Sequence, residues 1–155
     1  MCVLAASLSC PSGTTGPAAL AAPAVPSQDE LVIFFTGNEL GSLRPCGCSG
    51  GQLGGLAKRP AVFDRVPASR RLLVETGSLI AGEGEQELIK FRIFQEALRL
   101  LNYDVVHLTG RDFETATRLG LLSDPQPPFQ VLQAAEDGQS AVFTRRFTVN
   151  GREIT

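Results

Sequence analysis

Two cysteines separated by one glycine, Cys46 and Cys48, are the residues of this chain whose type and spacing best suit chemistry. They lie in a glycine-rich segment that follows closely on the apolar run at 31–35, and such a run predicts a buried strand. In α/β folds, ligands and reacting groups gather in loops beyond the carboxyl ends of strands. We therefore predict that the Cys46–Cys48 loop carries a functional site.

The first interpretation of the pair is redox chemistry or thiol binding. A disulfide closed across the single residue Gly47 would be strained and easily reduced, which suits a catalytic or sensing role. Nearby cations at Arg44, Lys58 and Arg59 would lower the thiol pKa if the fold brings them close. We favour this interpretation and expect a thiol or disulfide partner.

Two other interpretations stay open. Two thiolates supply half of a tetrahedral metal shell, so a metal would need further ligands from Cys2, Cys10, His107 or another subunit. His107 is the only histidine and lies within an apolar run, which is more typical of a core residue than of a ligand. In the third interpretation the cysteine pair only shapes its loop.

A second candidate site lies just after the cysteines, where Gly54 and Gly55 precede an expected helix. Backbone N–H groups at a helix start attract anions, and Lys58 or Arg59 would add positive charge. No Lys-Ser or Lys-Thr pair follows, so the segment is not a P-loop. We predict a small anionic or phosphorylated ligand here.

Composition limits the remaining classes of function. A length of 155 residues corresponds to about one domain with a core of its own. The net charge of −2 argues against a nucleic-acid partner, because such proteins usually carry a basic face. No apolar run approaches the roughly 20 residues of a transmembrane helix, so none is expected.

Residues 1–28 differ from the rest because they contain no charged residue and are rich in Ala, Ser, Pro and Gly. An apolar stretch at 3–8 and a small-x-small pattern at 19–21 predict a signal-like or disordered leader, although the usual basic start is missing. We expect an exported, periplasmic or envelope-associated protein, with Cys10 as the attachment site if it is a lipoprotein. The domain proper would span 29–155.

Apolar patterning predicts strands at 31–36, 71–75, 103–108 and 129–134, separated by helices at 53–66, 88–101 and 112–119. The first helix would be interrupted near Pro60, and the second would bury a face that includes Ile89 and Ile93. A hairpin at 141–155 would turn at Asn150-Gly151. This order predicts an α/β fold, a mainly parallel sheet with flanking helices that ends in a β-hairpin. Because the last strand stops after four residues, we expect the chain to be truncated.

The strand ends and the segments after them resemble the calcineurin-like metallophosphoesterases, in their 5'-nucleotidase-like branch. The resemblance covers residues 31–115. The matching segments are LVIFFTGNELG at 31–41, GGLAKR at 54–59, LLVETGS at 72–78 and LLNYDVVHLTGRDF at 100–113. Some members of this branch also carry Cys-Gly-Cys in the first loop. The resemblance implies the amino-terminal half of an α/β sandwich that builds a two-metal hydrolytic centre.

The positions that match the family's metal ligands carry residues poorly suited to that task. Leu40 has no donor atom, Asn38 and Ser78 offer neutral oxygens, and Arg111 brings a fixed positive charge. Asp112 stands where the family has its catalytic histidine. We therefore predict that metal-dependent hydrolysis is lost, that no cofactor is bound, and that the domain acts through Cys46 and Cys48.

The alternative is an active phosphoester hydrolase of the 5'-nucleotidase type. It would hold a divalent metal with non-standard ligands and would need a missing carboxyl-terminal half.

Overall fold

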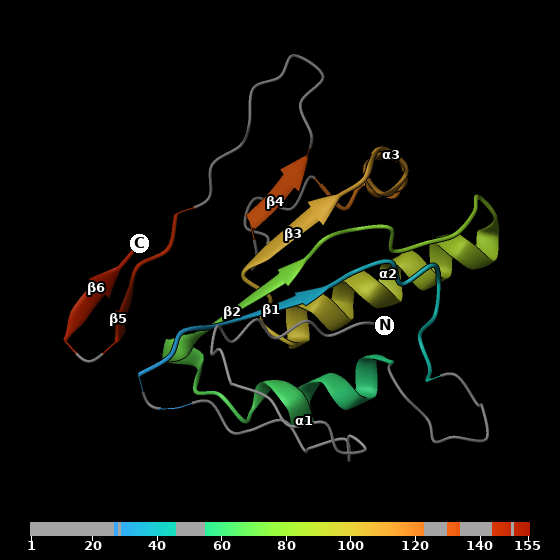
Figure 1. Ribbon diagram of the computed structural model, residues 1–155. Helices are drawn as coiled ribbons and strands as arrows, with labels where there is room; N and C mark the ends of the chain where they lie inside the picture. Colours follow the sequence, from blue (N-terminus) through green and yellow to red (C-terminus); the bar gives the residue numbers. More distant parts are fainter. Residues whose placement is uncertain (1–26, 28, 46–54, 123–129, 134–143, 150) are drawn as a thin grey trace, which may run out of the picture.

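The computed structural model describes residues 27, 29–45, 55–122, 130–133, 144–149 and 151–155. These residues form a parallel four-stranded sheet in the order β1-β2-β3-β4 and a separate antiparallel hairpin, β5-β6 (Figure 1). The predicted mixed α/β fold with a mainly parallel sheet and a terminal hairpin is confirmed. Its identity as half of a metallophosphoesterase sandwich stays a prediction.

The strands are β1 (Val32–Thr36), β2 (Arg71–Glu75), β3 (Val105–Leu108), β4 (Gln130–Gln133), β5 (Phe147–Val149) and β6 (Arg152–Ile154). The helices are α1 (Arg59–Phe63), α2 (Glu85–Leu100) and α3 (Gly110–Arg118), with short 3-10 turns η1 (Leu56–Lys58) and η2 (Ala68–Arg70).

All three helices contribute to a core on one face of the sheet. Strand order follows chain order, and right-handed crossovers between successive parallel strands leave their helices on the same side. Buried side chains from β1, β2 and β3 join buried side chains of the helices in one cluster: Phe34, Leu73, Val106 and Leu108 with Phe63, Phe91, Phe94, Leu98 and Ala116. On the opposite face of β1, Ile33 and Phe35 are 38% and 45% exposed.

Helix α2 has apolar residues on two sides, and the sequence pattern did not correctly predict which of them are buried. Phe91, Phe94 and Leu98, spaced by three and four residues, are fully buried. Ile89 and Ile93, which we predicted on the buried face, are 54% and 44% exposed. The large aromatic rings therefore decide which side of the helix faces the sheet, because they bury the most apolar area.

The segment around Pro60 is shorter in regular structure than predicted. Pro60 lies in the first turn of α1 rather than in the middle of a longer helix. Proline suits this position because the first helical N–H groups have no partner within the helix. The helix ends at Phe63, whose ring lies 5.1 Å from that of Phe34 and 5.8 Å from that of Tyr103. This aromatic cluster packs α1 against β1 and against the segment before β3.

The β5-β6 hairpin turns at Gly151 and lies against η2. Phe147 and Val149 are its buried side chains. Just before it, Arg145 forms an ion pair with Asp104, which also accepts a 2.8 Å hydrogen bond from the backbone of Leu73. The hairpin is thereby tied to the segment that leads into β3.

The predicted leader, residues 1–28, lies outside the described residues except for Ser27. In the part of the chain that the structure describes, no helix is long and apolar enough to cross a membrane.

Candidate functional site at the strand ends

The loops that follow β1 and β2 run side by side at the carboxyl edge of the sheet. Backbone N–H groups of Asn38, Leu40 and Gly41 donate to the carbonyls of Gly77, Ser78 and Leu79 at 2.9, 3.0 and 2.8 Å. The fold thus brings Asn38, Leu40 and Ser78 together, three positions that the sequence resemblance singled out.

Asp112, in the first turn of α3, joins the third loop to this pair. Its carboxylate accepts hydrogen bonds from the backbone N–H of Ser78 (2.8 Å) and of Leu79 (3.0 Å). It also accepts from the backbone N–H and the hydroxyl of Thr109, at 3.2 and 2.6 Å. Asp112 has no exposed surface, and both of its oxygens are occupied. In this structure the residue positions the loops, because its four bonds leave no oxygen directed at a ligand.

The backbone at this edge adopts an uncommon conformation. Asn38, Leu40 and Ser78 have φ angles of 57°, 47° and 58°, in the left-handed region that non-glycine residues rarely occupy. Such conformations cost about 1–2 kcal/mol per residue and persist where surrounding contacts hold them, often at functional sites. Here the paired backbone hydrogen bonds supply that support. The leucine side chain at position 40 is 49% exposed and directs an apolar group to solvent.

The side chains at this edge do not fit a two-metal centre. Among the described residues, no group of three or more His, Cys, Asp or Glu side chains is placed to hold a metal ion. Arg111 donates a 2.6 Å hydrogen bond to the carbonyl of Ala81, so its cation lies beside the loop after β2. Leucine, serine and asparagine side chains with a nearby guanidinium are a poor donor set for a divalent cation.

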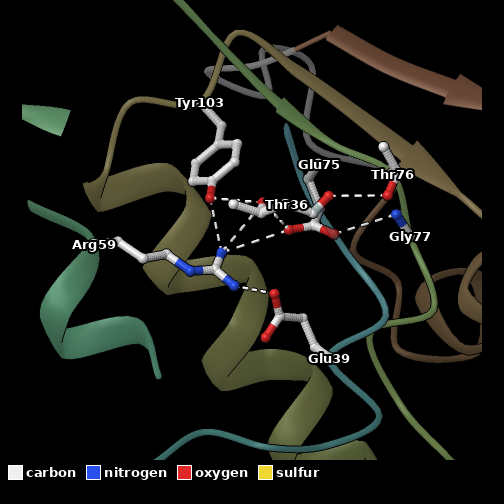
Figure 2. Close-up of polar contacts among 7 residues, drawn as sticks. All are labelled: Thr36, Glu39, Arg59, Glu75, Thr76, Gly77 and Tyr103. Atoms are coloured by element: carbon white, nitrogen blue, oxygen red, sulfur yellow. Dashed lines mark hydrogen bonds and ion pairs between the residues drawn. The ribbon is translucent and has the colours of Figure 1, made fainter. Parts of the chain in front are cut away.

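A buried polar network lies next to these loops (Figure 2). Arg59 from α1 is 2% exposed, and its guanidinium pairs with Glu39 and donates to the Tyr103 hydroxyl at 2.7 Å. The Thr36 hydroxyl donates to Glu75 Oε2 at 2.6 Å, and the backbone N–H of Gly77 donates to Oε1 at 3.2 Å. The network therefore connects α1, both strand ends and the segment before β3.

Its charges do not balance if every acid is ionised, because two carboxylates share one guanidinium. Burial raises the pKa of Glu75 to about 7, although the hydrogen bond from Thr36 and the charge of Arg59 oppose the shift. Burial also raises the pKa of Glu39 above its usual value, again against the attraction of Arg59. The pKa of Tyr103 rises to about 12, mainly through burial. With a pKa of about 7, Glu75 changes protonation near neutral pH.

The structure does not place all the residues predicted to bind an anion at the surface. The guanidinium of Arg59 is committed to the buried network, so this residue does not present a cation at the surface. Lys58 is exposed at the end of η1. Gly55 precedes η1 with φ 81°, and a Cβ there would lie 2.7 Å from the backbone nitrogen of Pro45. Gly54 lies outside the described residues.

Cys46 and Cys48 also lie outside the described residues, but both ends of their loop are described. The backbone N–H of Leu56 donates to the carbonyl of Leu43 at 3.4 Å, and Gly55 packs directly on Pro45. Residues 43–45 and 55–56, which flank the cysteine segment, thus lie next to each other.

His107, in β3, is half-buried, and its Nδ1 lies 3.1 Å from the carbonyl oxygen of Thr76. The imidazole therefore has a backbone partner at the strand end, next to the loop after β2.

No family model, curated protein or solved structure matches this chain. The resemblance to metallophosphoesterases rests on the sequence motifs alone.

Proposed function

We propose that this chain is a metallophosphoesterase-like domain that has lost metal-dependent hydrolysis and acts as a redox or thiol-binding module through Cys46 and Cys48. One observation carries the proposal. The strand-end loops are held together by a continuous set of hydrogen bonds, yet Asn38, Leu40 and Ser78 at their centre are poor ligands for a metal.

The chemistry at Asp112 supports the loss of hydrolysis. A general acid or base must reach the proton that it transfers, directly or through one water. Asp112 is buried and accepts four hydrogen bonds from its own chain, so it is unsuited to that role.

The neighbourhood of the cysteine loop supports thiol chemistry. Its ends are held close together by Leu43, Pro45 and Gly55, and the exposed cation Arg44 precedes Cys46 by two residues. A nearby cation favours the thiolate, which is the nucleophile in disulfide exchange. In the proposed reaction Cys46 and Cys48 give up two electrons and two protons to a partner disulfide, which leaves as two thiols.

Export would place the pair in an oxidising compartment, where such exchange has a role. A leader at 1–28 is the sequence feature that suggests this location.

Thiol trapping in defined glutathione redox buffers tests the proposal. We expect reversible formation of an intramolecular Cys46–Cys48 disulfide in the wild type and in the matched control Cys2→Ser/Cys10→Ser. The variant Cys46→Ser/Cys48→Ser should show no such transition. Failure of the wild type to form this disulfide reversibly would contradict the proposal. Metal-dependent hydrolysis of a phosphomonoester that survives Cys46→Ser/Cys48→Ser would instead support the hydrolase.

A further inference from the structure

Glu75 is a carboxyl group with no exposed surface at the end of β2. Gly37 packs against this carboxyl group: a Cβ atom added to the glycine would lie 3.3 Å from Glu75 Oε1. A chain of hydrogen bonds leads into the carboxyl group from Arg59 through the Tyr103 and Thr36 hydroxyls, over 2.7, 2.8 and 2.6 Å. When Glu75 is ionised, Thr36 gives its single proton to the carboxylate, so Tyr103 donates to Thr36.

We propose that Glu75 is a pH-sensitive latch: its protonated form keeps the loop at 37–41 closed over the strand ends, and its ionised form releases this loop. The proposal goes beyond thiol chemistry and does not depend on it.

The charges around Glu75 explain why ionisation favours release. Arg59 from α1 is the cation that faces it, at 3.5 Å, and it also pairs with Glu39. With Glu75 protonated, the buried charges of Arg59 and Glu39 cancel. With Glu75 ionised, a net negative charge is buried, which is costly in a low-dielectric interior. Tyr103 faces the same cluster and stays neutral near pH 7.

Among the residues that the structure describes, α2 and α3 supply no compensating cation to Glu75. On the α2 side, Glu87 and Lys90 border Gly41 and form an ion pair with each other at 2.6 Å. On the α3 side, the negative Asp112 borders Gly77 and is saturated by backbone and hydroxyl donors. Lifting the loop removes the Gly37 cover and carries Glu39 away, so that water solvates the ionised carboxylate.

The direction of the pH effect follows from the burial of Glu75. Its pKa is about 7 in the closed form and should return towards 4.5 when water reaches it. The closed form is therefore favoured fully below pH 4.5, and this advantage is lost as the pH rises through about 7. The corresponding increase in the open population is at most roughly 300-fold.

Amide hydrogen exchange measures the latch directly, because the N–H groups of Leu40 and Gly41 are bonded to the neighbouring loop only when it is closed. Protection factors, which remove the intrinsic pH dependence of exchange, should fall about 10- to 70-fold for these two amides between about pH 5 and about pH 8. The amide of Val106, inside β3, should stay better protected than these two at every pH, because opening of the loop leaves β3 intact and Val106 exchanges only through wider unfolding. In Glu75→Gln the protection of Leu40 and Gly41 should be independent of pH, and the exposed-site control Glu96→Gln should behave as the wild type does.

A second variant keeps the test decisive if Glu75→Gln does not fold. Glu39→Gln retains an acceptor for Arg59 but removes the competing charge, so the protection change should move to lower pH. Unchanged protection in the wild type, protection of Leu40 and Gly41 that equals that of Val106 at every pH, or an unshifted transition in Glu39→Gln would each overturn the proposal. So would a pH dependence that persists in Glu75→Gln.

Discussion

Replacing Asp112 by asparagine tests how strongly one carboxylate holds the strand-end loops. The better amide orientation keeps a carbonyl oxygen where Oδ2 now accepts from Ser78 and Thr109. The amide NH2 then faces the backbone N–H of Leu79, which Oδ1 now bonds at 3.0 Å. A buried donor left unpaired costs about 1–3 kcal/mol. Loss of a negative charge in the first turn of α3 adds about 0.3–1 kcal/mol. We therefore expect Asp112→Asn to lower the free energy of unfolding by about 1–4 kcal/mol.

Urea unfolding measures this loss. Far-ultraviolet circular dichroism is the suitable signal, because the chain has no tryptophan whose fluorescence could report unfolding. Glu114→Gln is the matched control, since it changes an exposed carboxylate on the same helix and should alter stability by less than about 0.5 kcal/mol. A loss below about 1 kcal/mol in Asp112→Asn, or the same loss in both variants, would refute the reasoning.

Three further changes probe the same region. Arg59→Met leaves Glu39 and Glu75 buried without their cation, so urea unfolding near pH 8 should show a free energy of unfolding lower by about 3–5 kcal/mol. The loss should be smaller near pH 5, because the carboxyls take up protons there. Equal losses at both pH values would argue against a charge effect. Gly77→Ala should cost about 1–3 kcal/mol in thermal or urea unfolding, because φ is 92° and the new Cβ would lie 3.0 Å from the His107 carbonyl oxygen; an unchanged stability would show that the loop adapts. Wild-type stability should fall by about 2–3 kcal/mol from pH 5 to pH 8, because the raised pKa of Glu75 favours folding only while the group is protonated; Glu75→Gln should remove most of this fall.

The regular elements were predictable where apolar patterning and strand length agree. The run RLLVE gives β2 (Arg71–Glu75) with the predicted bounds, and Asn150-Gly151 correctly indicates the hairpin. Helix α2 was predicted as an element, but its buried side was not. Its sequence carries apolar residues on both sides, and periodicity alone cannot tell Phe91 from Ile93.

The candidate site was only partly predictable. The resemblance singled out Asn38 and Ser78, which the parallel register does bring together. The buried network was missed because Glu39, Glu75 and Tyr103 are far apart in sequence and meet only through that register. One signal was present: Glu75 occupies an inward position at the end of an apolar strand, two residues after the buried Leu73. A charged residue in such a position requires partners, and these define the network.

Metal analysis by mass spectrometry, on protein purified without chelator, tests the central claim most directly. The wild type and Cys46→Ser/Cys48→Ser should be compared side by side. Our account predicts no stoichiometric metal in either protein. Near-stoichiometric metal that survives the double substitution would contradict the account, because the strand-end positions would then form a working metal centre. Metal that is lost with the cysteines would also contradict it, by identifying a thiolate metal site in place of a redox pair.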